Sequence, residues 1–294
     1  MSCHMRRLIV LLTIGTLLAV SAGCRQPEAE PLYRGAQSIQ WDGLERTFNV
    51  HLPPSYTASQ DWPVVVVLHG GGGSASQVER STGFSDTADE EGFIAVYPNG
   101  TGFFDSALLT WNAGHCCGYA LGNGIDDVGF FRTMMSEIGS RLSIDSSHIY
   151  VTGMSNGAMM AYRLGAECPD IITAIAPVAG AIGGRATTNA PLWLPSQPAH
   201  PVSVLAIHGT ADPHVLYDGG HGPDMIGTRV DVSVAESIDF WIKANGCDPQ
   251  PRTTPISAGV VRVTYSGGFD GPWWNSLPSR TAATSGPAPI MTRW

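Results

Sequence analysis

Residues 153–157 read Gly-Met-Ser-Asn-Gly, a G-x-S-x-G pattern centred on Ser155. An apolar segment expected to be a strand precedes it, and a segment expected to be a helix follows it. Glycines on both sides of a serine permit a strained turn that exposes its hydroxyl above the edge of a sheet. The start of the following helix offers N–H groups and partial positive charge to a developing oxyanion. The stretch therefore predicts a nucleophile elbow, with Ser155 as the attacking group.

A second glycine-rich stretch, His69 followed by four glycines at 70–73, comes directly after the apolar run 63–68. A flexible turn would explain the glycines, but it would not explain their place at the end of a central strand, where α/β sheets bind ligands. Backbone N–H groups of this loop, together with the N–H of Asn156, are expected to form an oxyanion hole. His69 itself is expected to support the loop rather than to act as a base.

A third stretch, 208–213, reads His-Gly-Thr-Ala-Asp-Pro and again follows an apolar run. The carboxylate of Asp212 could orient and charge-balance an imidazole. The alternative is that Asp212 and Pro213 merely form a turn. The position after Ser155 favours the acid, because hydrolases with this kind of sheet run serine, then acid, then histidine.

The elements that must position these loops alternate along the chain. Apolar runs predict strands, and helical spacing of apolar residues predicts helices. Strands are expected at residues 47–52, 63–68, 93–97, 149–152, 174–178 and 202–207, and helices at 126–142, 158–168 and 232–245. Strands that alternate with helices imply a mostly parallel sheet covered on both faces. The expected fold class is an α/β three-layer sandwich.

Composition restricts the function classes. The chain has 294 residues and a formal net charge of −9, and Lys243 is its single lysine. One domain is expected at this length, and nucleic acid is excluded as a partner because phosphate binding needs clustered Lys and Arg. No C-x-x-C or paired-histidine spacing indicates zinc, so no metal is expected.

The N-terminus has the pattern of an export signal. Arg6 and Arg7 precede an apolar run at 8–20, and small residues then lead to Cys24. The cysteine after Ala-Gly resembles a bacterial lipobox, so residues 1–24 are expected to be a signal peptide that leaves Cys24 lipidated and membrane-anchored. The alternative is ordinary signal cleavage near the same place. Both place the mature protein outside the cytoplasm, with residues 25–43 as a tether.

Export makes disulfides possible. Apart from Cys3 and Cys24, the cysteines are Cys116, Cys117, Cys168 and Cys247. Four cysteines allow three pairings, and the sequence does not choose among them. Adjacent cysteines cannot easily bond each other, so Cys116 and Cys117 are each expected to reach a distant partner.

Taken together, the motifs resemble a known family. They stand at residues 68–73 (LHGGGG), 111–114 (WNAG), 116–118 (CCG), 126–130 (DDVGF), 153–164 (GMSNGAMMAYRL) and 208–213 (HGTADP). This combination resembles the polyhydroxybutyrate depolymerase and feruloyl esterase group of α/β-hydrolases, which includes secreted lipoprotein members. The resemblance spans residues 44–270 and implies a catalytic domain at 44–271. It implies a secreted serine carboxylesterase that needs no cofactor and acts as a monomer.

The resemblance also assigns roles. It implies that Ser155 is the nucleophile, that Asp212 is the acid of the triad, and that Gly70, Gly71 and Asn156 form the oxyanion hole. The implied substrate is a hydroxyalkanoate oligomer or a feruloyl or acetyl ester.

The segment 111–118 is implied to line the ester pocket, above all through Trp111 and Asn112. The alternative for Trp111 is an aromatic side chain packed under a long loop.

The base of the triad departs from the family pattern. Family members carry the histidine near the C-terminus in a G-G-G-H-x-W-P-G segment, whereas the last histidine here is His221. Residues 272–294 contain no histidine and show no strand or helix period, so they are expected to be an aberrant, disordered tail. The resemblance also implies a cysteine where Gly268 stands, so Cys247 is expected to be a free thiol.

The genetic code suggests a cause. Codons for residues 282–288, read one base early, accommodate Gly-Gly-His-x-Trp-Pro-Gly in that order. We therefore hypothesise a single-base insertion or deletion near codon 271, which resequencing of this stretch tests. As it stands, the chain would lack the last strand and the last helix of the fold and the histidine base of the triad. It would then be an impaired pseudo-hydrolase. His214 and His221, just after Asp212, are the candidate substitute bases.

Overall fold

The computed structural model describes residues 33–104, 107–225, 227–268 and 281–283. The predictions for the signal peptide, for Cys24, for the first part of the tether and for most of the tail fall outside these residues. The chain from Tyr33 onward forms one compact unit.

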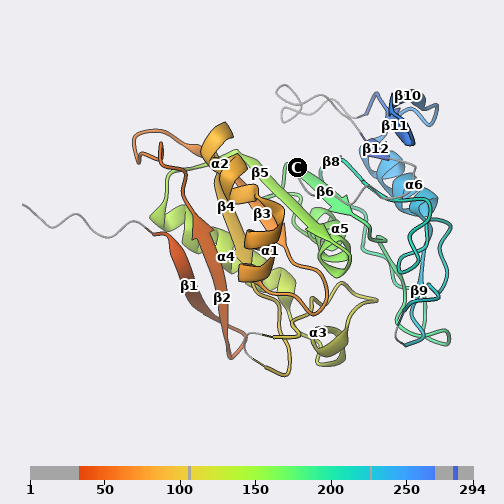
Figure 1. The fold of residues 1–294 in the computed structure, drawn as a ribbon, viewed down its shortest axis with the longest axis horizontal. Coiled ribbons are helices and arrows are strands. Elements are labelled where there is room, and N and C mark those ends of the chain that lie inside the picture. The colour runs from red at the N-terminus through yellow and green to blue at the C-terminus, as the bar shows by residue number, and fades with distance from the viewer. Residues whose placement is uncertain (1–32, 105–106, 226, 269–280, 284–294) are drawn as a thin grey trace, which may run out of the picture. The chain divides into compact units, whose positions relative to one another are not determined.

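A seven-stranded sheet forms the centre of this unit (Figure 1). Its order is β1-β2-β4-β3-β5-β6-β8; the pairs β1–β2 and β2–β4 are antiparallel, and the strands from β4 to β8 are parallel. The strands are β1 (Gly35–Trp41), β2 (Leu44–His51), β3 (Trp62–Leu68), β4 (Ile94–Pro98), β5 (Ile144–Met154), β6 (Ala174–Val178) and β8 (Ser203–Val204). The predicted α/β fold with a mostly parallel sheet is confirmed.

The tether predicted over residues 25–43 is wrong for its second half. Strand β1 pairs with β2 from Gly35 to Trp41, so this segment belongs to the sheet. Ile39 and Trp41 alternate with polar residues and pack against the core, and Trp41 Nε1 donates to Asp126 O at 3.2 Å. A half-buried edge strand with polar residues on its other face gives only a weak apolar signal, which explains the error.

Helices cover both faces of the sheet, as Figure 1 shows with α1 and α2 in front and α4 and α5 behind. The helices are α1 (Ala75–Thr82), α2 (Phe84–Glu91), α3 (Gly118–Gly122), α4 (Asp127–Arg141), α5 (Asn156–Glu167) and α6 (Val234–Asn245). A small core lies under α1 and α2, and a larger core joins α4, α5 and α6 to the other face. None of the described helices combines the length and the apolar character needed to cross a bilayer.

Local signals explain where the predicted helices begin and end. Asp126 caps α4 by accepting from the Gly129 N–H at 2.9 Å. Ser233 and Glu236 form a capping box at the start of α6, and Gly246 ends that helix in the left-handed conformation. The helices α1 and α2 were not predicted, because each spans only 8 residues and few of these are buried.

The C-terminal part of the chain forms a separate small sheet. Strands β10 (Arg252–Ser257) and β11 (Val260–Tyr265) make a hairpin, and β12 (Thr281–Ala283) pairs with β11. The disordered tail predicted over residues 272–294 is therefore wrong for the three residues of β12, and the rest of it lies outside the described residues. Within the described part, β8 is the last strand of the main sheet and α6 is the last helix, so the predicted loss of further elements is not tested.

The cysteine pairing differs from the expectation. Cys116 and Cys117 are joined by a disulfide, so neither reaches a distant partner. The loop folds back at this point, because Ala113 N donates to Cys116 O and Cys117 N to Trp111 O. Both sulfurs thus lie beside the Arg229 guanidinium, at 3.0 and 3.3 Å.

Cys247 is a free thiol, as the resemblance implied. A Cβ atom added at Gly268 would lie 3.8 Å from the sulfur of Cys247. The position of Gly268 therefore fits the place where the resemblance puts a cysteine partner.

Candidate active site

Ser155 occupies a strained turn between β5 and α5. Its φ of 55° and ψ of −120° are rare for a residue with a side chain, and such strain persists where the surroundings enforce it. The surroundings here are backbone atoms: a Cβ atom on Gly157 would lie 2.5 Å from His69 O, and one on Gly153 would lie 2.7 Å from the carbonyl carbon of Gly157. No larger residue fits at either position. The predicted strand-turn-helix setting of Ser155 is therefore present.

The predicted oxyanion residues lie around this turn. A Cβ atom added at Gly70 would be 3.8 Å from Ser155 Cβ, and one added at Gly71 would be 3.6 Å from Asn156 Cβ. Asn156 is the first residue of α5, so its N–H has no acceptor within the helix. The structure thus brings Gly70, Gly71 and Asn156 together beside Ser155, and their role in binding an oxyanion stays a prediction.

His69 supports the glycine loop and is buried. Its Nδ1 lies 2.8 Å from Gly70 O, and its Nε2 lies 3.0 Å from Gly100 N. A carbonyl accepts and an amide donates, so Nδ1 carries the proton and Nε2 is the acceptor of a neutral ring. Burial lowers the pKa of His69 to about 4. This agrees with the expectation that His69 is a structural residue.

The lowered pKa of His69 predicts a pH-dependent stability. The folded pKa lies below the ordinary value of 6.5, so between pH 6.5 and pH 4 the unfolded chain binds a proton that the folded chain excludes. The contribution of His69 to the free energy of unfolding is fully present above pH 6.5. It is lost as the pH falls, and the loss reaches about 3 kcal/mol near pH 4. Urea unfolding measured at pH 7 and pH 4.5 checks this.

The matched variants for this measurement are His69→Gln and His200→Gln. We expect His69→Gln to flatten the loss between pH 6.5 and pH 4, because glutamine does not titrate. His200 is exposed, so its replacement should leave the loss as in the wild type. Equal slopes for wild type and His69→Gln would contradict the prediction.

Trp111 is buried beside the glycine loop. Only 2% of its surface is exposed, and its indole Nε1 donates to His69 O at 2.9 Å. Its burial favours the alternative of an aromatic side chain packed under a loop, and its place in the ester pocket stays a prediction.

Asn112 is occupied by structural hydrogen bonds. Its side chain donates to Ile125 O at 2.9 Å, and its N–H donates to Asp127 Oδ2 at 2.7 Å. Asp127 also pairs with Arg46 at 2.6 Å, and both side chains are buried. This ion pair anchors the loop that carries Trp111. In the sequence Asp127 stands out only as part of the DDVGF motif, and Arg46 carries no local signal.

The predicted acid lies at the same edge of the sheet as Ser155. Ser155 N donates to Val178 O at 2.9 Å, and Val178 forms a parallel bridge with Ile207, five residues before Asp212. Asp212 Oδ1 accepts from the backbone N–H groups of His214 at 2.9 Å and Val215 at 3.1 Å. These bonds hold the carboxylate in a tight turn. Asp212 can therefore belong to a turn and still serve as the proposed acid of the triad.

Three histidines follow or flank this acid. His214 is joined to Asp212 through its backbone, and His221 Nδ1 lies 2.9 Å from Arg229 O. The imidazole nearest the Asp212 carboxylate is that of His208, with Nε2 at 3.5 Å from Oδ2 and 2.7 Å from Val215 O. Within the described residues, no imidazole is hydrogen-bonded to the Ser155 hydroxyl.

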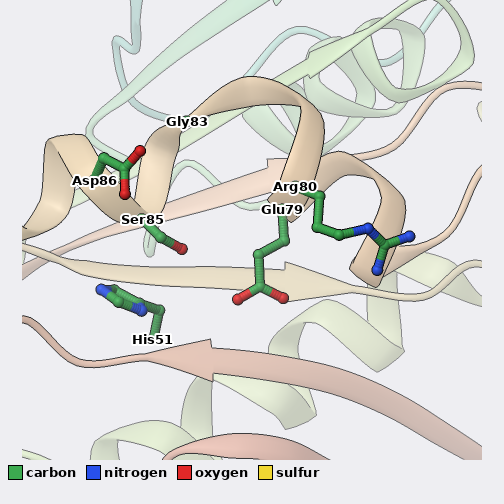
Figure 2. Close-up of a pocket in the computed structure, with 6 residues that line it drawn as sticks. All are labelled: His51, Glu79, Arg80, Gly83, Ser85 and Asp86. Carbon is green, nitrogen blue, oxygen red and sulfur yellow. The ribbon is translucent and has the colours of Figure 1, made fainter.

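A shallow pocket lies elsewhere, between β2 and the helices α1 and α2 (Figure 2). It is lined by His51, Glu79, Arg80, Gly83, Ser85 and Asp86. His51 pairs with Asp89 at 2.7 Å, and Glu79 accepts from Asn49 at 2.8 Å. None of the lining residues belongs to the Ser155 turn. No group of three or more metal-ligating side chains occurs among the residues that the structure describes.

Comparison with known sequences gives consistent matches. A family model described as "Esterase PHB depolymerase" matches residues 46–192. NocK from Nocardia uniformis subsp. tsuyamanensis, whose name describes an esterase, is 31% identical over 74% of this chain and 62% of that protein. Feruloyl esterase B from Piromyces equi is 31% identical over 69% of this chain and 36% of that protein. The chain thus spans less than two thirds of the length of these two curated relatives.

A solved structure shows the same fold. Acetyl xylan esterase from Aspergillus awamori superposes with a TM-score of 0.57 at 16% identity, covering 86% of this chain and 93% of that one. At this identity the likeness shows the fold alone.

Proposed function

The chain belongs to the esterase PHB depolymerase family, as the resemblance predicted, and from this premise we propose that it is a serine carboxylic-ester hydrolase. The observation that carries the proposal is the Ser155 turn, with its φ of 55° and the Gly70 backbone directly beside it. Strain of this kind is maintained where the chain needs a particular side-chain direction. We expect this conformation to direct the Ser155 hydroxyl toward the space next to the glycine loop.

The proposed mechanism has two steps. Ser155 Oγ attacks the ester carbonyl carbon, and the N–H groups of Asn156 and Gly71 stabilise the negative oxygen that forms. The alcohol leaves with a proton, and an acyl-enzyme remains. Water then attacks the acyl-enzyme, the acid leaves, and Ser155 regains its proton. A general base must take the serine proton in the first step, and Asp212 is proposed to orient it.

The proposed substrates are feruloyl or acetyl esters or hydroxyalkanoate oligomers. The names of the relatives support the first two, and the family description supports the third. We also propose that the protein is exported and held by a lipid on Cys24, on the signal pattern of residues 6–24 alone. Radioactive palmitate labelling of wild-type and Cys24→Ser chains separates lipidation from ordinary cleavage.

A second candidate function is a ligand-binding remnant without catalysis. One observation favours it: no imidazole among the described residues is hydrogen-bonded to the Ser155 hydroxyl. Loss of the base alone lowers the rate by several orders of magnitude in enzymes of this chemistry.

Covalent labelling tests the proposed function directly. We expect the purified chain to hydrolyse p-nitrophenyl acetate and to lose this activity with a fluorophosphonate. Peptide mass spectrometry should place one phosphonyl group on the peptide that contains Ser155, because only an activated serine reacts quickly. A chain that is neither labelled nor active would support the remnant instead.

A further inference from the structure

Trp111 contacts both halves of the proposed oxyanion hole. Its backbone N–H donates to Asn156 Oδ1 at 2.7 Å, and its carbonyl accepts from Asn156 Nδ2 at 3.0 Å. Its indole N–H donates to His69 O at 2.9 Å, and its ring centroid lies 4.9 Å from that of His69. One residue therefore joins the elbow to the glycine loop through three hydrogen bonds.

The contact with His69 reaches the loop amide that the mechanism uses. Gly70 O accepts from Gly73 N at 3.0 Å and faces His69 Nδ1 at 2.8 Å. In a planar trans peptide the N–H of Gly71 points opposite to the carbonyl of Gly70. Fixing Gly70 O toward His69 therefore fixes the direction in which the Gly71 N–H points.

The contact with Asn156 acts on the other half. The side-chain amide of Asn156 is buried and uses both its oxygen and its nitrogen on the Trp111 backbone. This pair of bonds holds the first residue of α5, whose own N–H is the second proposed oxyanion donor. A small displacement of either donor weakens an oxyanion hole, because stabilisation of the oxyanion depends on preorganised donor positions.

We infer that Trp111 is a positioning residue that holds the Asn156 and Gly71 donors in register for the oxyanion. This inference rests on the proposed ester hydrolysis and adds a residue to its machinery. The indole N–H acts by holding the His69 carbonyl, and it touches no substrate. Its effect must then fall on stabilisation of the transition state and not on substrate binding.

The chain offers a matched control in Trp241 on α6. Trp241 is fully buried, as Trp111 nearly is. Its Nε1 has no hydrogen-bond partner among the described residues, whereas that of Trp111 donates to His69 O. Replacing either tryptophan with phenylalanine removes similar packing, but only Trp111→Phe removes a hydrogen bond.

The test uses kinetics and a boronic acid. We expect Trp111→Phe to lower kcat for p-nitrophenyl acetate by about 10- to 100-fold and to leave KM within about 2-fold. The inhibition constant of phenylboronic acid, whose serine adduct resembles the tetrahedral intermediate, should rise by a similar factor. Trp241→Phe should leave all three values unchanged. A wild-type kcat in Trp111→Phe, or the same loss in Trp241→Phe, would overturn the inference.

A separate readout covers the case in which the proposed function fails. If the wild type hydrolyses the ester no faster than Ser155→Ala, the esterase proposal falls, and amide hydrogen exchange then tests the positioning role. Faster exchange of residues 69–73 in Trp111→Phe but not in Trp241→Phe supports the role. Equal exchange in both variants rejects it.

Discussion

Ser155→Ala is expected to lower kcat/KM for p-nitrophenyl acetate by at least about 10⁴-fold. The alanine leaves no nucleophile, and what remains is the smaller contribution of the oxyanion donors and of substrate binding. The free energy of unfolding should change by less than about 0.5 kcal/mol. Ser155 is the N-cap residue of α5, but its side chain makes no capping hydrogen bond, so little native structure is lost. Stopped assays and urea unfolding measure the two quantities.

Ser233 is the matched control, since it is the N-cap residue of α6. Its hydroxyl accepts from Glu236 N in a capping box. Ser233→Ala should therefore cost about 1 kcal/mol of stability and leave kcat/KM unchanged. Ser155→Ala is thus expected to lower kcat/KM but not stability, and Ser233→Ala to lower stability but not kcat/KM. A rate loss in both variants would indicate a general disturbance of the fold.

The size of the Ser155→Ala effect also reports on the missing base. In a serine hydrolase, removing the nucleophile or the histidine alone costs about as much as removing the whole triad. If the folded chain supplies no base, its rate is already low, and Ser155→Ala changes it little. A ratio near 1 would therefore favour the remnant, whereas a ratio of about 10⁴ requires a working base.

The sequence predicted the parts of this site that depend on local chain geometry. The Ser155 elbow, the glycine loop at 70–73 and the parallel strands each leave a local signal, because close backbone contacts demand glycine and buried strands demand apolar runs. Family motifs added Asp212, whose backbone hydrogen bonds are also local. The elbow, the glycine loop and Asp212 lie at the edge of the sheet where they were expected.

The parts that failed depend on contacts between distant segments. The contact of the Trp111 indole with His69, which is 42 residues away in the chain, left no signal in the sequence. Strand β1 is recognisable only once β2 is known to pair with it. The pairing of Arg46 with Asp127 links residues 81 positions apart, which no local pattern records.

Asp127→Asn should lower the free energy of unfolding by about 3–5 kcal/mol, because it breaks a buried ion pair. Arg46 and Asp127 are 2% and 0% exposed, and the guanidinium also stacks on Phe130 at 4.0 Å. Asparagine keeps the shape and can still accept from Asn112 N, but it leaves the Arg46 charge buried without a counter-charge. A loss of this size is a large fraction of the stability of a typical domain.

Two further variants separate the ion pair from general damage, with urea unfolding as the measurement. Replacing Arg46 with methionine in the Asp127→Asn chain removes the unpaired charge, so the double variant should regain most of the lost stability. Asp170→Asn breaks the exposed pair with Arg132, at 39% and 54% exposure, and should cost at most about 1 kcal/mol. Equal losses for Asp127→Asn and Asp170→Asn would show that burial does not set the strength of these pairs. Asp127 also accepts from the N–H of Asn112, the residue after Trp111. The stability of the fold and the placement of Trp111 therefore depend on the same carboxylate.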